Sequence, residues 1–245
     1  MAFSRLDHEL VSRNLVDSRE LGKRLILAGK VTVNGHVIDK ASNKVKSDDV
    51  IKIKEAPKYV SRGGFKLEEA LKVFKVDPSG LICLDIGAST GGFTDCLLQH
   101  GAMKVHAYDT GTNQLSWKIR SDPRVNSRER LNCRHLTKED IEDQIDLIVI
   151  DVSFISLTKI LPAAHTVGSS NCSIITLIKP QFELSRDEVS KGGIVKDPEL
   201  HQKSVSKIVN FATSELQLNH AGTTNSPITG TGGNVEFLAH FIKTR

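Results

Sequence analysis

The chain has 245 residues, of which 39% are hydrophobic and 25% are charged. This composition is typical of folded globular proteins and argues against general disorder. The net charge of +4 is unevenly spread, because residues 1–60 carry 12 Lys and Arg against 8 Asp and Glu, whereas the rest carries 21 of each. The imbalance indicates either a lysine-rich solvated face or a polyanion-binding domain ahead of a neutral one.

Residue spacing argues against a metal site, a membrane span and an exported protein. The four cysteines, Cys83, Cys96, Cys133 and Cys172, include no pair with the two-residue spacing of zinc or redox sites. No apolar run approaches the ~20 residues that cross a bilayer, and no signal-peptide pattern opens the chain. We therefore expect a reduced, cytoplasmic protein with no metal and no membrane partner, and the oligomeric state is left open.

The first sixty residues predict a small α+β domain. The stretch VDSRELGKRLILAG is typical of a capped helix, with Asp17 or Ser18 at its start and Gly29 at its end. Asn34 and Gly35 form a strong signal for a two-residue hairpin turn. The expected order is helix, helix, hairpin and strand, at about residues 6–14, 18–29, 30–38 and 48–54.

Basic side chains lie on or beside the two predicted helices. Such side chains suit contacts with nucleic-acid phosphates, which supply affinity rather than sequence reading. The stretch SRLDHELVSRNLVDSRELGKRLILAGKVTVNGHVI resembles the small RNA-binding domain of ribosomal small-subunit protein four, pseudouridine synthases and tyrosyl-tRNA synthetases. The resemblance implies binding to structured RNA, for which the candidate residues are Arg5, Arg19, Lys23 and Lys30.

A domain boundary is expected at about residue 60, because Pro57 and the pair Gly63-Gly64 interrupt regular structure there. The expected parts are an RNA-binding domain, a linker and a second domain, at residues 1–60, about 55–64 and 61–245. The stretch FKLEEALKVF opens the second domain and predicts a helix.

From about residue 80, apolar strands alternate with helical patterns, which predicts an α/β fold with a mostly parallel sheet and helices on both faces. Strands are expected in LICLDIG, VHAYD, IDLIVIDVS and SIITLIKP, and helices at about 93–100, 113–120, 156–164 and 198–215. In such sheets, ligands bind at the carboxyl ends of the strands. A last alternating strand, in GGNVEFLAHFIK, would begin at this same edge if it were antiparallel to its neighbours.

The loop GASTGG joins the carboxyl end of the first of these strands to a helix. Gly87, Gly91 and Gly92 let backbone approach a ligand, but a dinucleotide site needs a further glycine where Ser89 stands. A nucleoside without phosphate fits this loop better. Asp109 ends the next strand, where a carboxylate can accept hydrogen bonds from both ribose hydroxyls. The spacing therefore favours S-adenosylmethionine over NAD.

Charged side chains at strand ends are unusual for apolar surroundings. Asp151 ends a strand that is buried on both faces, Lys179 ends the next, and Glu236 lies near the start of the last. Asp85, before the glycine loop, could organise that loop or receive the ammonium group of the ligand. A buried charge costs free energy unless it is paired. The strand-end charges could form structural ion pairs, or could join Lys66 around a reacting oxygen.

Six stretches resemble the TlyA family in the order of its motifs: YVSRGGFKL, CLDIGASTGGFTDCLL, AYDTGTNQLSWKIRSDPRV, DVSFISL, IKPQFE and GNVEF. The resemblance implies a Rossmann-like class I methyltransferase domain of the FtsJ type, with a seven-stranded sheet, behind the RNA-binding domain. It also implies S-adenosylmethionine as the cofactor and 2′-O-methylation of a cytidine in ribosomal RNA. The catalytic tetrad of the family falls on Lys66, Asp151, Lys179 and Glu236.

The chain departs from the family pattern at Thr110, where valine is expected, and in NCRHL, which leaves Asn132 as the candidate on the adenine side. Family members that modify both ribosomal subunits tend to have a longer tail, so the short tail here implies large-subunit (23S) RNA as the substrate. The expected cofactor-binding residues are Asp85, Gly87, Ser89, Gly91, Gly92, Phe93, Asp109 and Asn132.

The expected reaction is in-line attack of a ribose 2′-oxygen on the sulfonium methyl group. Lys179 is the candidate base, because a partly desolvated lysine near another cation is easier to deprotonate. Lys66 is that cation or holds the nucleotide, Asp151 orients Lys179, and Glu236 holds the ribose or one lysine. The alternatives are an NAD-dependent oxidoreductase, a non-catalytic RNA-binding assembly factor and a membrane-active haemolysin, which the lack of a long apolar segment disfavours.

Overall fold

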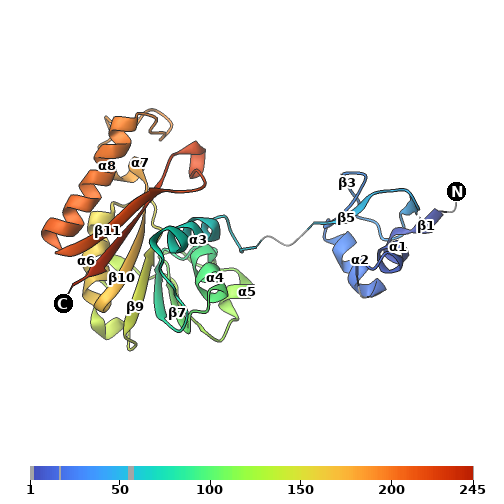
Figure 1. Ribbon diagram of the computed structural model, residues 1–245, viewed down its shortest axis with the longest axis horizontal. Coiled ribbons are helices and arrows are strands. Elements are labelled where there is room, and N and C mark those ends of the chain that lie inside the picture. The colour runs from blue at the N-terminus through green and yellow to red at the C-terminus, as the bar shows by residue number, and fades with distance from the viewer. Residues whose placement is uncertain (1–2, 17, 55–57, 245) are drawn as a thin grey trace. The chain divides into compact units, whose positions relative to one another are not determined.

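A computed structural model describes residues 3–16, 18–54 and 58–244. The chain divides into two compact units, Met1–Lys58 and Tyr59–Arg245 (Figure 1). Asp17 and Pro57, which the sequence suggested as a helix cap and a linker residue, lie outside the described residues.

The amino-terminal unit combines two helices with short antiparallel strands. The two expected helices, the hairpin and the later strand all form, and β1 with β4 makes an additional pair. A strand of three residues is too short for its alternation of apolar and polar residues to be recognised from the sequence. The elements are β1 (Phe3–Arg5), α1 (Leu6–Ser12), α2 (Arg19–Leu27), β2 (Val31–Val33), β3 (His36–Val37), β4 (Lys44–Lys46) and β5 (Ile51–Ile53).

Local signals explain where these elements begin and end. The Ser18 side chain caps α2 by accepting a hydrogen bond from the backbone N–H of Leu21, at 3.2 Å. Asn34 and Gly35 have φ values of 50° and 85°, the left-handed pair that a two-residue hairpin turn requires. The buried core consists of Leu6, Leu10, Val16, Ile26, Val31, Val33, Val45 and Ile51.

A buried carboxylate links the two helices of this unit. Asp7 of α1 is fully buried and accepts hydrogen bonds from the Nε atoms of Arg5 and Arg19, each at 2.9 Å. The guanidinium of Arg5, with that of Arg19, holds the pKa of Asp7 below its usual value. Two of the four candidate RNA-binding bases therefore also hold the helices together.

The second unit is built on a seven-stranded sheet, as expected. Five neighbouring strands are parallel, and β12 runs antiparallel to both of its neighbours, β10 and β11. The strand order is β11 (Leu218–Asn225), β12 (Phe237–Lys243), β10 (Gly168–Ile178), β9 (Ile145–Ile150), β6 (Ile82–Ile86), β7 (Lys104–Tyr108) and β8 (Val125–Arg128).

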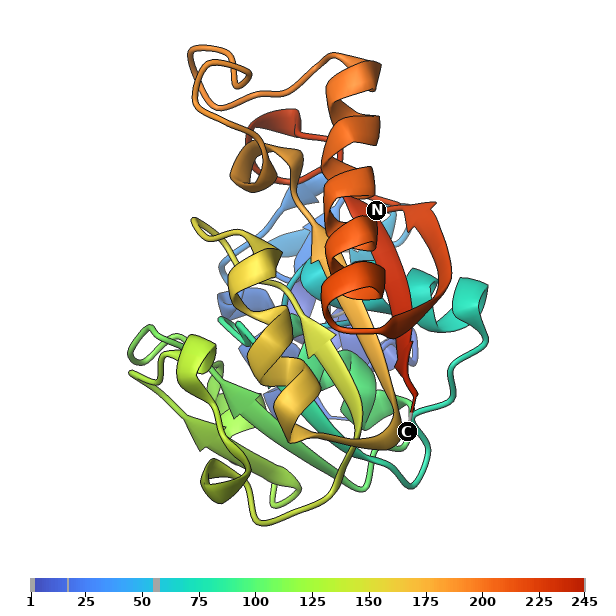
Figure 2. The ribbon, with the colours of Figure 1, turned by 90° about the vertical axis from the view of Figure 1, so that its left-hand side faces the viewer.

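Helices cover both faces of this sheet (Figure 1), and Figure 2 shows α6 and α8 on one of them. Alternate residues of β9 explain the two layers: Leu147 and Val149 pack in the core with α3 and α4, whereas Ile148 and Ile150 pack in the core with α6 and α8. The helices are α3 (Gly63–Phe74), α4 (Gly92–Gln99), α5 (Trp117–Arg120), α6 (Leu161–Val167), α7 (Pro180–Glu183) and α8 (Pro198–Asn210).

Four differences from the sequence expectation concern polar or irregular segments. The helix expected over 113–120 is shortened to α5, and the one expected over 156–164 is a short 3-10 turn, η3 (Leu157–Lys159), followed by α6. The helix expected over 198–215 ends as a π-helical turn at Phe211–Glu215. The strands β8 and β11 were not expected, because VNSR and LNHAGTTN contain few apolar residues.

Replacing Asp7 by asparagine should loosen the amino-terminal unit at neutral pH, because the two guanidinium groups lose their shared charge. Hydrogen exchange of the α1 and α2 amides in the full chain should quicken by about tenfold. The exposed Asp48→Asn variant should leave exchange unchanged. The pKa of Asp7 is lower in the folded chain than in the unfolded chain. The stability that the ionised Asp7 contributes is therefore present above the unfolded pKa of about 3.9, and it is lost as the pH falls through the folded pKa. A difference between variant and parent that does not shrink as the pH falls would contradict this account.

Candidate active site

A cavity of about 750 Å³ opens at the edge of the sheet where its parallel strands end. Its walls come from segments that are far apart in the sequence: residues 61–66, the glycine loop, the ends of β9 and β10, and the loop between β11 and β12. All four members of the expected tetrad, Lys66, Asp151, Lys179 and Glu236, line this one cavity.

Strand register explains how three of the four side chains meet. Ile178 pairs with Phe237, so Lys179 and Glu236 are the next residues at the same edge. Ile150 is the last residue of β9, and the following residue, Asp151, is bonded through its backbone N–H to the carbonyl of Ile86 in β6. Lys66 reaches the cavity from α3.

The four charges form two ion pairs. Lys66 Nζ lies 2.5 Å from Glu236 Oε2, and Lys179 Nζ lies 2.6 Å from Asp151 Oδ1. Lys179 Nζ also donates a hydrogen bond to Ser153 Oγ at 2.9 Å. The side chain of Glu236 is only 2% exposed, whereas that of Asp151 is 22% exposed. The side chains of Lys66 and Lys179 are about equally exposed, at 9% and 11%, so the two pairs differ mainly in the exposure of their carboxylates.

The loop between β11 and β12 leaves room for the carboxylate of Glu236. A Cβ atom on Gly230 would overlap Glu236 Oε1. The backbone N–H of Gly230 donates to the carbonyl of Asn234 at 2.9 Å, and Arg62 donates to the carbonyl of Thr229 at 2.5 Å. Sequence reasoning did not identify Gly230, because its role depends on a side chain that folds back across the loop.

Four of the six N–H groups of the glycine loop are occupied within the protein. The N–H groups of Gly87 and Ala88 donate to the carbonyl of Tyr108, that of Ser89 donates to Asp109 Oδ2 at 2.8 Å, and that of Gly91 donates to Ala88. A pyrophosphate site needs such groups pointing free at the ligand. These four groups are not available for that purpose.

The glycines of this loop are required by packing within the protein. Gly87 has φ 87°, and a Cβ atom there would overlap the carbonyl oxygen of Asp151. A Cβ atom on Gly92 would overlap Ser61 Oγ, and Gly91 has φ 94° and lines neither cavity. The sequence suggested these glycines both for close approach of a ligand and for otherwise unfavourable dihedrals. The positive φ of Gly87 and Gly91 agrees with the second reason, and tertiary contacts add a third.

Asp85 is fully buried and lines neither cavity. It accepts a hydrogen bond from Thr94 Oγ1 at 2.6 Å, across the whole glycine loop. Burial raises its pKa to about 7. Of the two roles left open for this residue, organising the loop fits the geometry better than receiving a ligand.

A second cavity, of about 430 Å³, continues from the first and contains Asp109 and Asn132. The two cavities share four lining residues: Gly87, Ser89, Asp151 and Ser153. Ser89 is exposed, and Phe93 lines only the first cavity. Together the cavities form one cleft that runs from the carboxylate of Asp109 to the tetrad.

Two aromatic side chains at the rim of the cleft were not expected from the sequence. Phe154 lines the second cavity, is 91% exposed and has φ 64°. Its ring centroid lies 5.1 Å from that of Phe182 in α7. A bulky residue at positive φ, exposed beside a cleft, is a sign of function that only the structure reveals.

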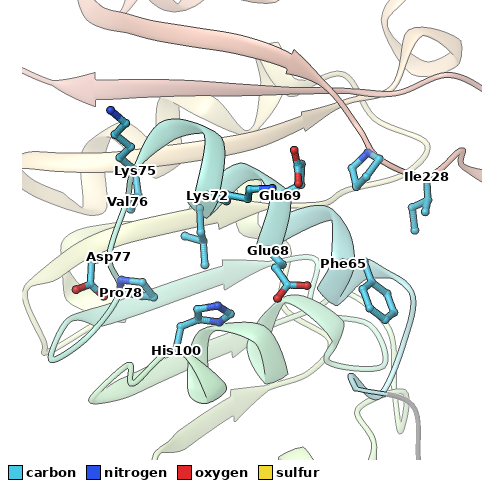
Figure 3. A pocket seen from close by; sticks show the side chains of 12 residues that line it. Phe65, Glu68, Glu69, Lys72, Lys75, Val76, Asp77, Pro78, His100 and Ile228 are labelled. Atoms are coloured by element: carbon cyan, nitrogen blue, oxygen red, sulfur yellow. The ribbon is translucent and has the colours of Figure 1, made fainter.

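A separate hollow of about 830 Å³ lies along α3 (Figure 3). Phe65 and Ile228 lie at one end of it, and Lys75 and Asp77 lie at the other. None of the expected site residues lines this hollow, and its charged side chains are of both signs. The chemistry of the molecule therefore points to the cleft at the sheet edge.

Two absences concern only the described part of the chain, residues 3–16, 18–54 and 58–244. No helix there is long and apolar enough to cross a membrane. No group of three or more His, Cys, Asp or Glu side chains there could hold a metal ion.

Comparison with known proteins agrees with this geometry. Residues 59–243 match the FtsJ-like methyltransferase family, and residues 4–51 match the S4 domain. The chain belongs to the FtsJ-like methyltransferases. The resemblance to the TlyA type, with its S4 domain ahead of the methyltransferase domain, is thereby confirmed.

Three relatives illustrate the match of this methyltransferase to its family. Hemolysin A of Brachyspira hyodysenteriae is 48% identical over 97% of this chain and 99% of its own length. The 16S/23S rRNA (cytidine-2′-O)-methyltransferase TlyA of Mycobacterium tuberculosis is 44% identical over 96% of this chain and 88% of its own length. A solved structure, a putative hemolysin from Streptococcus thermophilus, is 44% identical, with a TM-score of 0.76 over 100% of this chain and 90% of that one.

Replacing Gly230 by alanine should displace the carboxylate of Glu236 and separate it from Lys66. Methyl transfer should slow by about tenfold to a hundredfold, because small misplacements in an active site are costly. Circular dichroism should show an unchanged fold. Gly222→Ala is the control, because a methyl group there meets only Phe74, at 3.4 Å. Equal rates for the two variants would mean that the pair of Lys66 and Glu236 is not needed.

Proposed function

We propose that the chain transfers a methyl group from S-adenosylmethionine to the 2′-hydroxyl of a cytidine in ribosomal RNA. The observation that carries this proposal is the convergence of Lys66, Asp151, Lys179 and Glu236 in one cavity, at the end of a cleft that begins at Asp109. The Mycobacterium tuberculosis relative is named for the same reaction.

The cleft suits a nucleoside that carries an amino-acid tail. Asp109 would accept hydrogen bonds from the ribose hydroxyls, with Asn132 beside the adenine and with Gly87 and Ser89 along the tail. Asp109 already accepts the N–H groups of Ser89 and Gly111, and its oxygens keep further lone pairs for a ligand. The occupied N–H groups of the glycine loop disfavour NAD, whose pyrophosphate would need them.

S-Adenosylmethionine supplies, when bound, a methyl group that is already activated on a sulfonium. The chain's own task is then to orient the ribose and to accept one proton. As a lone pair of the 2′-oxygen forms the bond to the methyl carbon, the carbon–sulfur bond would break with its electron pair going to sulfur, and S-adenosylhomocysteine would leave. The 2′-O–H proton would pass to the Lys179 amine. Asp151 and Ser153 hold that amine in place.

Lys66 has a different part in this proposal. Its counter-charge is Glu236 and its side chain is 9% exposed, so it is a fixed cation at the floor of the cavity. A fixed cation with three donors suits the oxygens of a nucleotide and orients the ribose. Glu236 thus serves the substrate through Lys66.

Replacing Lys179 by alanine should abolish methyl transfer while calorimetry shows nearly unchanged S-adenosylmethionine affinity, because the amine lines the substrate cavity and not the one that contains Asp109. Lys72→Ala, in α3 and outside the cleft, should be as active as the parent. Equal loss of binding and of transfer in the first variant would make Lys179 a structural or donor-binding residue instead.

Mapping of ribose methylation in ribosomal RNA, from cells with and without the protein, tests the function as a whole. One cytidine should lose its 2′-O-methyl group when the protein is absent. We expect it in 23S RNA, and loss in both 16S and 23S RNA would correct that expectation. Identical maps would refute the function. A titration with NAD should show no binding.

RNA affinity should come largely from the amino-terminal unit. Because Arg5 and Arg19 also serve Asp7, the clean test reverses Lys23 and Lys30 to glutamate. RNA binding should weaken, and its dependence on salt should flatten by about two phosphate contacts. Lys138→Glu, an exposed lysine that lines neither cavity, is the control. Unchanged affinity in the double variant would remove these two lysines from the RNA-binding set.

A further inference from the structure

The pair of Asp151 and Lys179 lies where the sheet no longer sets the distance between its strands. The last paired residues of β9 and β10 are Ile150 and Thr176, and Lys179 lies three residues beyond that pair. The backbone of Asp151 is held from its other side, by Ile86 of β6. The 2.6 Å contact therefore depends on how α7, which follows Lys179, sits against the loop that follows Asp151.

One buried carboxylate joins these two segments. Glu183, at the end of α7, accepts hydrogen bonds from Ser156 Oγ at 2.5 Å and from the backbone N–H of Leu157 at 2.8 Å. Both partners belong to the loop and 3-10 turn that follow Asp151. Lys207 of α8 lies 3.3 Å from Glu183 Oε2 and also donates to the Glu183 carbonyl at 2.5 Å.

Burying a carboxylate at this position costs free energy, so its presence indicates a specific role. The Glu183 side chain is 1% exposed, and burial raises its pKa. A buried ion pair is often no more stabilising than a well-packed apolar side chain. Its distinctive contribution is geometric, because two acceptor oxygens fix the direction of three donors.

The aromatic pair supports the same connection. Phe154 of the loop and Phe182 of α7 are neighbours of the hydrogen-bonded residues in sequence, and their ring centroids lie 5.1 Å apart. The loop and α7 are therefore joined on the rim of the cleft by ring contact and in the interior by Glu183.

We propose that Glu183 is a positioning residue, which holds the loop after Asp151 against α7 and so keeps Lys179 in contact with its carboxylate partner. The proposal rests on the proposed function for its consequence in catalysis, but the contact itself can be measured without any reaction.

The test compares Glu183→Gln with Glu188→Gln in the full chain. Glu188 is a matched control, because it is also bonded to a serine and to a lysine of α8, Ser185 and Lys203, but in an exposed loop. In Glu183→Gln, kcat for rRNA methylation should fall by about tenfold, while the affinity for S-adenosylmethionine changes by less than about twofold. Glu188→Gln should match the parent in both.

A second readout would not respond to a merely structural role. The Nζ signal of Lys179, followed by NMR in lysine-labelled protein and assigned with Lys179→Ala, should move toward the position of exposed lysines in Glu183→Gln, because its 2.6 Å contact with Asp151 opens. An unchanged Nζ signal would overturn the proposal, whether or not kcat falls.

Two further outcomes also test the proposal. If Glu183→Gln does not fold, Ser156→Ala removes one of the same hydrogen bonds, and it should move the Lys179 Nζ signal in the same direction by a smaller amount; no movement would overturn the proposal. If the parent protein methylates no rRNA, the proposed function fails, and the Nζ signal still decides whether Glu183 holds the pair.

Discussion

The antiparallel pairing of β12 with β10 is the constraint on which the catalytic edge depends. The pairing of Ile178 with Phe237 places Lys179 and Glu236 at the same edge, although they are distant in sequence. A slip of one residue would turn the Glu236 side chain to the other face of the sheet. Lys66 would then be a buried ammonium without a counter-charge, which costs far more than a missing surface pair. The apolar register and the ion pair of Lys66 and Glu236 thus select the same arrangement.

Much of this edge could be predicted from the sequence, because strands buried on both faces make their terminal charges conspicuous. Asp151 and Lys179 each follow an apolar run, and these two and Glu236 do lie together. The contact of Asp151 with Lys179 was expected and forms, whereas Glu236 was left open between the ribose and one lysine. That Glu236 meets Lys66 depends on strand register and on the place of α3, and neither leaves a local signal in the chain.

The rest of the fold also separates into elements that local sequence determines and elements that tertiary contacts determine. The strongly apolar strands and the capped helix α2 were predictable, whereas β8 and β11 gain their structure from neighbouring strands and not from their own composition. Glycines could be located but not explained, since Gly87 is fixed by a carbonyl more than sixty residues away. Asp7 is the corresponding case in the amino-terminal unit, where an acid among candidate RNA-binding bases has an internal role.

The occupied N–H groups of the glycine loop have a consequence for selectivity. In a cell, any adenosine-binding cleft competes with abundant adenine nucleotides, all of which present anionic oxygens. A loop whose amides are already bonded to Tyr108, Asp109 and Ala88 offers those oxygens little attraction. The glycine loop can thus contribute to discrimination against ATP-like competitors before any contact with the base is made.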